Sequence, residues 1–410
     1  MTQEMIFGAN HDVAWPACLT HPPAAEDIGA AKAFIIAEGS QLCAAAVGHD
    51  ARAVVLTGSM SRNEATLKKD GESWRVLGDA TFLIVFDRPV RLGIAELERE
   101  IERRLLARGI RCKIVVVTST SAELRKMRPH IYAYELRERG VVVWGDRQVL
   151  HLMPRFTPAD IPKQDGWWFL CNRMIEQLES AADANSENDP AVRYRIAKLY
   201  LAMAACYLLE IGQYEPSYRE RAAHLQQLAA SDDPQPEPIP LQRFAKFVSR
   251  CTDLKLHGEK VVLRNDFPQW RDAVSDAEAL WRWALSRILG LNPSLGRTDL
   301  LAALAARQSI FARAKGWVRA ACVQPLTFSR YGLRWARLAC STSPRYLVYE
   351  AASEFFFTAP YRDAIMPSEL AAIVARLPLP QGEADQQVSW RTVAKLVARN
   401  FHVLLESTRS

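Results

Sequence analysis

The spacing of apolar residues changes at about residue 160, and this change constrains the fold more than any other feature of the sequence. Before it, short runs rich in Val and Ile alternate with helical segments. After it, the segments are long, repeat their apolar residues every three or four positions, and carry no strand signal. The sequence therefore predicts an α+β protein: a mixed-sheet α/β domain over residues 1–152, followed by an all-helical region.

The predicted N-terminal domain contains four strands between helices. The helices are expected at 25–47, 94–109 and 121–139, with a short helical turn near 61–67, and the strands at 52–57, 81–87, 111–119 and 141–146. Asp70-Gly71 is a strong hairpin signal, so a two-stranded excursion is expected over residues 67–79.

The helical region is expected to form two parts on either side of the Pro-rich acidic stretch SDDPQPEPIP, residues 231–240. The first part covers 160–230, with a polar break at 185–190, and the second covers 241–410. Helices in the second part are expected at 241–252, 270–289, 298–322, 329–340, 345–356, 367–376 and 387–405.

Composition and charge narrow the class of protein. No window of 18 residues is uniformly apolar, and the first 20 residues lack the pattern of a signal peptide, so we expect a cytoplasmic protein without a membrane partner. The eight cysteines are scattered singly, which favours buried reduced thiols over zinc. The net charge of +6 is concentrated in residues 301–410, where 14 Lys and Arg stand against 7 Asp and Glu.

A candidate phosphate-facing turn lies in VVLTGSMSRNEAT, residues 54–66. A strand ends at Gly58-Ser59 and a helix starts directly after it, which exposes backbone N–H groups and a hydroxyl to an anion. Arg62 could contact a phosphate, and Glu64 could pair with Arg62 or cap the helix. In the next strand, GDATFLIVF, Asp79 opens the apolar run, where a carboxylate could hold Mg²⁺ against a triphosphate.

These motifs together resemble the polymerase β-type nucleotidyltransferase superfamily. GSMSRNEAT resembles the GSxARGEAT-like motif of one branch, GDATFLIVF its acidic strand, and PHIYAYELRERGVVVWGD (residues 129–146) its closing helix and strand. The resemblance covers about residues 30–225. It implies a nucleotidyltransferase-like fold, an NTP as substrate, and two Mg²⁺ ions held by three carboxylates, with the helical segment after residue 160 packing over the nucleotide.

The chain departs from that pattern where the metals should bind. Asp79 matches the first carboxylate and would be a metal ligand, but Thr81 replaces the second. Lys113 stands where the third acid should be, and no Asp or Glu occurs from residue 103 to 122. Asp87 lies too far along its strand to substitute.

Three hypotheses follow from the retained fold and the altered metal site. The first is a nucleotidyltransferase-fold protein with reduced or lost catalysis that still binds a nucleotide. The second is an active Mg²⁺-dependent nucleotidyltransferase, using Asp79 and an acid from the helical part, with an unknown acceptor. The third is a helical scaffold whose basic end binds an acidic partner.

The helical region supplies further candidates for the nucleotide site. In the resembled family, a lysine placed like Lys198 in YRIAKLYLAMAAC can meet the triphosphate; a lysine at the rim of a core is the alternative. Tyr214, Tyr218 and Arg221 could line the same cleft or belong to the core. In the basic C-terminal third, cations alternate with aromatic residues, a pattern that can bind single strands, but we do not expect a nucleic acid partner.

Overall fold

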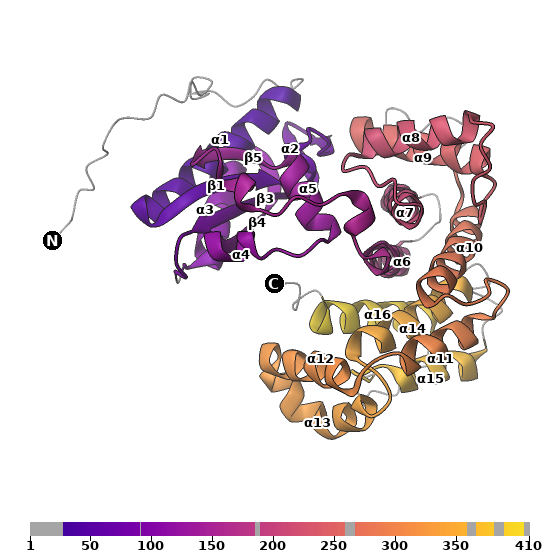
Figure 1. The fold of residues 1–410 in the computed structure, drawn as a ribbon. Coiled ribbons are helices and arrows are strands. Elements are labelled where there is room, and N and C mark those ends of the chain that lie inside the picture. Colours follow the sequence, from indigo (N-terminus) through magenta and orange to yellow (C-terminus); the bar gives the residue numbers. More distant parts are fainter. Residues whose placement is uncertain are drawn as a thin grey trace. The chain divides into compact units, whose positions relative to one another are not determined.

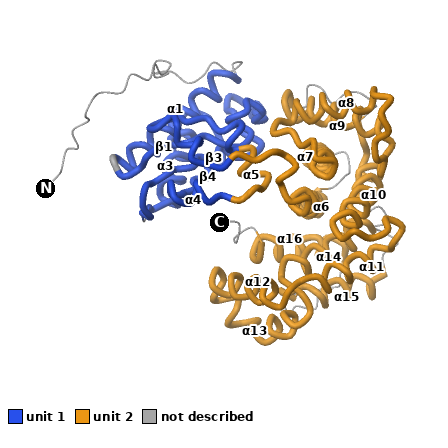
Figure 2. Tube along the Cα trace, in the orientation of Figure 1, with its two compact units in different colours: residues 1–127, 136–154 blue, residues 128–135, 155–410 orange. Residues whose placement is uncertain are grey.

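The chain divides into an N-terminal α/β unit and a C-terminal helical unit (Figure 2). Unit 1 comprises residues 1–127 and 136–154, and unit 2 comprises residues 128–135 and 155–410. The computed structural model describes residues 28–90, 92–184, 189–258, 267–358, 366–380 and 389–405. Four features from the sequence analysis lie outside these residues: the start of the first helix before residue 28, Cys18, the break at 185–188 and the helix start at 387–388.

A sheet forms the centre of unit 1. Among the described residues it has five strands: β1 (Ala51–Thr57), β2 (Leu67–Asp70), β3 (Ser73–Phe86), β4 (Ile110–Thr120) and β5 (Val141–Gly145). The central strand β3 pairs antiparallel with β1 and β2 and parallel with β4, while β5 pairs antiparallel with β1. The predicted α+β class is therefore confirmed; the specific nucleotidyltransferase-like fold stays a prediction.

The parallel pairing of β3 with β4 depends on the crossover helix α3 (Ile94–Leu106). Leu97, Ile101 and Leu105 form its buried face, at helical spacing. On its other flank, Glu102 accepts the backbone N–H of Ile114 at 2.9 Å, and Glu98 accepts that of Val116 at 2.8 Å. These carboxylates accept hydrogen bonds from backbone N–H groups of β4 that do not pair with a neighbouring strand. They thereby cover part of the edge of β4.

Helix α1 (Ile28–Val47) packs on the same sheet (Figure 1). A Cβ at Gly39 would come within 2.2 Å of the Phe82 ring, so the helix backbone lies directly on β3. Contrary to the sequence prediction, α1 is long and apolar enough to cross a membrane. Phe34, Ile35 and Cys43 are buried in the core of unit 1, and a single helix of this kind is a weak membrane signal.

Two predicted elements of unit 1 have different bounds. The helix expected at 121–139 is split into α4 (Ser121–Arg125) and α5 (Ile131–Arg139), because Pro129 disfavours helical geometry in the residue before it. The strand expected at 81–87 starts earlier, at Ser73, since it continues through the confirmed hairpin at Asp70-Gly71. Gly71 has a φ of 63°, the left-handed conformation that this turn requires.

Unit 2 is built from helices around one extended apolar core. Its helices are α6 (Lys163–Asp183), α7 (Pro190–Glu210), α8 (Tyr218–Ala230), α9 (Leu241–His257), α10 (Trp270–Leu289), α11 (Arg297–Ala306), α12 (Ile310–Val323), α13 (Pro325–Ala339), α14 (Pro344–Thr358), α15 (Pro367–Arg376) and α16 (Trp390–Leu404). α7 is buried nearly all round and packs against α6, α9 and α10. The predicted helix 298–322 is two helices, since Ser309 caps a new start at α12. The division of the helical part at 231–240 stays a prediction.

The prediction of buried thiols is correct for five cysteines and wrong for two. Cys43, Cys112, Cys171, Cys206 and Cys251 are free and buried. Burial raises the pKa of Cys43 to about 12, which suppresses its reactive thiolate. Cys322 and Cys340 are exposed, because they lie on the outer faces of α12 and of the turn that follows α13.

Candidate functional site

The turn that follows β1 is built on Gly58 and the four-residue helix α2 (Gly58–Ser61). Gly58 has a φ of 74°, a conformation that residues with a Cβ seldom adopt. The Ser61 hydroxyl donates to the Gly58 carbonyl at 2.9 Å, and the Glu64 N–H donates to the Ser59 carbonyl at 2.8 Å. The helix begins at Gly58 rather than near residue 61, and polar groups of the turn bind one another.

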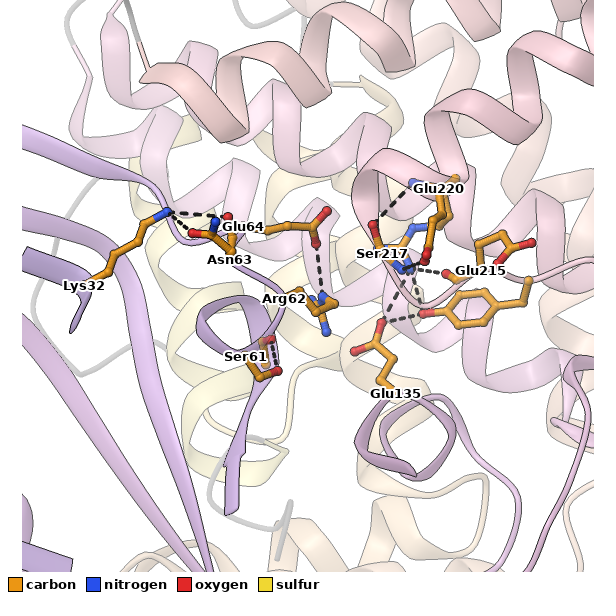
Figure 3. Close-up of polar contacts among 12 residues, drawn as sticks. Lys32, Ser61, Arg62, Asn63, Glu64, Glu135, Glu215, Ser217 and Glu220 are labelled. Atoms are coloured by element: carbon orange, nitrogen blue, oxygen red, sulfur yellow. Dashed lines mark hydrogen bonds and ion pairs between the residues drawn. The ribbon is translucent and has the colours of Figure 1, made fainter. Parts of the chain in front are cut away.

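Arg62 and Glu64 form a buried ion pair within this turn (Figure 3). Arg62 Nε donates to Glu64 Oε2 at 3.0 Å, and their side chains are 5% and 1% exposed. Asn63, which lies between Arg62 and Glu64, accepts a hydrogen bond at Oδ1 from Lys32 of α1 at 3.0 Å. The pair therefore holds the turn in place, and a phosphate contact by Arg62 stays a prediction.

The strand pairing brings the predicted metal-site residues onto neighbouring positions. Thr57, the last residue of β1, pairs with Thr81 of β3, and Asp79 of β3 pairs with Lys113 of β4. Side chains of paired residues and of residues two apart point to the same face of a sheet. One carboxylate, two hydroxyls and one ammonium thus share this face next to the Gly58 turn.

No described group of three or more His, Cys, Asp or Glu side chains is placed to hold a metal ion. Asp79 is exposed, and its charge contributes to the raised pKa of Cys112, which burial raises first. Asp87 lies at the opposite end of β3, where it accepts the Ser121 hydroxyl at 2.7 Å and pairs with Arg52 at 3.4 Å. These bonds lower the pKa of Asp87, and its role is to join β1, β3 and α4.

A second group of charged residues lies within unit 2, around Glu176 of α6. Its carboxylate accepts Arg195 Nη1 at 2.6 Å and Lys198 Nζ at 3.4 Å, both from α7, and it also pairs with Arg173. Lys255 of α9 lies close enough to act on the Lys198 charge. Three cations therefore lie around the Glu176 carboxylate, with Lys255 near one of them, and we call these five residues the Glu176 cluster.

The Glu176 cluster has an excess of positive charge in a buried position. Burial first, and then repulsion by Arg173, Arg195 and Lys255, lower the pKa of Lys198 to about 7 against the attraction of Glu176. Although burial favours the neutral acid, the surrounding cations keep the pKa of Glu176 below its usual range. An additional anion would stabilise the charged form of Lys198.

Tyr214 and Arg221 belong to a buried hydrogen-bond network in unit 2. The Tyr214 hydroxyl donates to Glu135 Oε1 at 2.7 Å, and Arg221 Nη1 donates to the Tyr214 oxygen at 2.8 Å and the Glu215 carbonyl at 2.7 Å. Figure 3 shows this network beside the capping bonds between Ser217 and Glu220 at the start of α8. Arg221 is 1% exposed, so the network orders the entry to α8.

Tyr218 connects this network with the Glu176 cluster. The Arg221 guanidinium lies 4.8 Å from the centre of the Tyr218 ring, and Lys255 Nζ lies 5.9 Å from it. Lys255 Nζ also lies 5.8 Å from the ring of Tyr194. The aromatic faces thus offer the buried cations a favourable contact.

Sequence reasoning did not identify Arg173, Glu176, Arg195 and Lys255. The spacings 173 to 176 and 195 to 198 correspond to one turn of a helix, and this was the available signal. The meeting of α6, α7 and α9 at one point has no local sequence signal, because it depends on how the helices pack.

The two tryptophans that stand among the cations of the basic C-terminal third are core residues. Trp317 of α12 and Trp335 of α13 are 6% and 2% exposed, with ring centres 5.5 Å apart. Tyr331 is partly buried against the same core. Stacking of bases on the two tryptophans would require the hairpin to open.

No protein-family model matches this chain, and no curated protein sequence matches it.

Proposed function

We propose that unit 1 is a nucleotidyltransferase-like domain with reduced or lost catalysis, and that the protein still binds a nucleotide through its phosphates in the cytoplasm. The order of β1, β3 and β4, with α3 as the crossover, is compatible with such a domain. The observation that carries the proposal is the face beside Gly58, where Asp79, Thr81 and Lys113 stand together.

The chemistry of two-metal catalysis explains why this face argues for reduced activity. Two Mg²⁺ ions about 4 Å apart need carboxylates that bridge them. Thr81 supplies a neutral oxygen, and Lys113 adds a positive charge opposite Asp79. A metal pair would meet one anionic ligand and one repelling cation on these strands.

The Glu176 cluster, which lies wholly within unit 2, is a second setting in which a phosphate could bind. Three cations around one carboxylate leave a net positive charge in a buried position, where electrostatic attraction to a phosphate is stronger than in water. Lys198 and Arg195 both come from α7, so one rigid helix fixes their spacing.

Calorimetric titration of the full chain with ATP, GTP, CTP and UTP, each with and without Mg²⁺, tests this function. We expect at least one nucleotide to bind in the absence of Mg²⁺, and Lys198→Met to weaken that binding roughly tenfold, the effect of about 1.4 kcal/mol. Lys395→Met is the matched control, because Lys395 pairs with Asp183 on the exposed surface of unit 2. No binding of any nucleotide would refute the proposal.

A second readout separates the reduced protein from an active enzyme. Mg²⁺-dependent release of pyrophosphate that Asp79→Ala abolishes would show an active nucleotidyltransferase instead. We also expect Asp79→Ala to change the nucleotide affinity. Affinity that stays unchanged would argue against a site at the Gly58 turn.

A further inference from the structure

The hairpin of α12 and α13 exposes large apolar side chains to an unusual degree. Among the described residues, every large apolar side chain more than 60% exposed lies on these two helices: Ile310 at 79%, Phe311 at 78%, Val318 at 61%, Leu326 at 86% and Leu333 at 87%. Soluble proteins seldom gather such residues on one surface unless it contacts something.

Cations occupy the same surface at regular spacing. On α12, Phe311, Lys315, Val318 and Cys322 follow one another at intervals of four, three and four residues, and all are exposed. On α13, Leu326, Arg330, Leu333 and Arg337 repeat this spacing and are also exposed. Each outer helix face is therefore a stripe in which apolar residues and cations are mixed. We call these the two outer stripes.

The charge of this region has one sign. From residue 300 to residue 349 the sequence contains 8 Lys and Arg and no Asp or Glu. Three of these arginines bind backbone carbonyls, since Arg307 donates to Leu289, Arg313 to Cys340 at 2.8 Å and Arg334 to Leu377 at 2.7 Å. Lys315, Arg330 and Arg337 remain exposed on the outer stripes.

The inner side of the hairpin is fixed by packing. Trp317 and Trp335 contact each other there, and a Cβ at Gly316 would lie 3.2 Å from Pro344 at the start of α14. α12 and α13 lie side by side within unit 2 (Figure 1). The outer stripes are thus presented by a firmly packed scaffold.

We propose that the two outer stripes bind the surface of an anionic phospholipid bilayer. Leu326 and Leu333 insert below the headgroups, while Lys315, Arg330 and Arg337 contact lipid phosphates. The five apolar side chains of the hairpin named above are 61–87% exposed and therefore protrude as separate groups. A bilayer can deform around such groups, whereas a folded partner would need a groove for them, so a bilayer is the better fit. Stacking of single-stranded nucleic acid is disfavoured because Trp317 and Trp335, the largest aromatic faces of the hairpin, are buried, although Phe311 is exposed. Binding to one surface of a bilayer does not require a helix that spans it.

Co-sedimentation of the full chain with vesicles tests this proposal. We expect the protein to pellet with phosphatidylcholine vesicles that contain about 30 mol% phosphatidylglycerol, and not with phosphatidylcholine alone. Raising the salt from about 0.05 to 0.5 M should release it, because the attraction is screened. Equal pelleting with both vesicles, or none with either, would overturn the proposal without any variant.

Variants of the outer stripes assign the effect to these residues. Leu326→Gln with Leu333→Gln should lower the vesicle partition coefficient by roughly tenfold or more. Arg330→Gln with Arg337→Gln should lower it roughly 25-fold, at about fivefold for each cation. Leu106→Gln is the matched control, since Leu106 of unit 1 is 57% exposed, and it should change nothing.

Circular dichroism checks that the variants fold, which exposed positions should permit. Unchanged partition in folded stripe variants would refute the assignment. If the wild type binds polyanionic RNA or an acidic peptide with the same dependence on the stripe residues, but not anionic vesicles, the partner is not a membrane and the proposal fails.

Discussion

Replacing Lys198 by methionine should stabilise the folded protein, and this gain should fall as the pH rises. Lys198 Nζ lies 3.4 Å from Glu176, but burial and the repulsion of Arg173, Arg195 and Lys255 lower its pKa from 10.5 to about 7. Methionine keeps much of the apolar stem and removes the charge. Glu176 keeps its two arginine partners in the variant.

The pKa difference between the folded and unfolded chain sets the size of this effect. At about 1.4 kcal/mol for each pH unit, keeping Lys198 charged in the folded state costs about 5 kcal/mol below pH 7. The folded state releases the proton above about pH 7, while the unfolded chain holds it up to about pH 10.5. The unfolded chain therefore binds more protons in this window, and the stability of the wild type rises with pH.

Urea unfolding at about pH 6, 8 and 10 measures the effect in the wild type and in Lys198→Met. We expect the variant to be more stable by about 5 kcal/mol at the lowest pH and by about 1 kcal/mol at the highest. Tryptophan fluorescence is a suitable signal, because most tryptophans lie in unit 2. Lys395→Met should change stability by less than about 1 kcal/mol at each pH. A variant less stable than the wild type at low pH, or a difference independent of pH, would refute the reasoning.

Three further predictions concern the turn and the thiols. Gly58→Ala should lower the melting temperature, because its φ of 74° costs about 1–2 kcal/mol for a residue with a Cβ. Glu64→Gln should destabilise the protein by a few kcal/mol in urea unfolding, since it removes the buried counter-charge of its arginine partner. A maleimide should modify Cys322 and Cys340 in the native protein, and replacing both by Ser should lower the number of adducts by two, as counted by intact mass.

Matched control substitutions separate these effects from a general sensitivity of the protein to mutation. A Cβ at Gly78, like one at Gly58, would have no heavy atom within 4 Å, but Gly78 does not have a positive φ. Gly78→Ala should therefore be tolerated better than Gly58→Ala. Glu96→Gln breaks an exposed pair with Arg99, where the change should stay within about 0.5 kcal/mol. Modification of Cys43 as fast as Cys322 would contradict the buried position that raises its pKa.

The residues around the Gly58 turn show how far local patterns predict a site. The apolar runs set strands β1, β3 and β4, and parallel strands joined by a helix have few registers available. The pairing of Lys113 with Asp79 follows from where each apolar run starts. The sequence could not reveal that Arg62 and Glu64 are buried, because burial depends on what packs over the turn.

The Glu176 cluster and the outer stripes show the opposite case. Lys198 was a candidate because of the family resemblance, yet its three cationic neighbours come from α6, α7 and α9. In the hairpin, the sequence shows aromatic residues and cations in alternation, and only the fold buries Trp317 and Trp335 while exposing Leu326 and Leu333.

The sequence by itself determined the class of fold, the glycine turn and the absence of carboxylates at Thr81 and Lys113, because strand periodicity and residue chemistry are local properties. The tertiary structure alone decided which charges meet around Glu176 and which apolar residues α12 and α13 leave exposed. Both depend on contacts between segments far apart in the chain. Such contacts arise from packing that minimises exposed apolar surface over a whole unit.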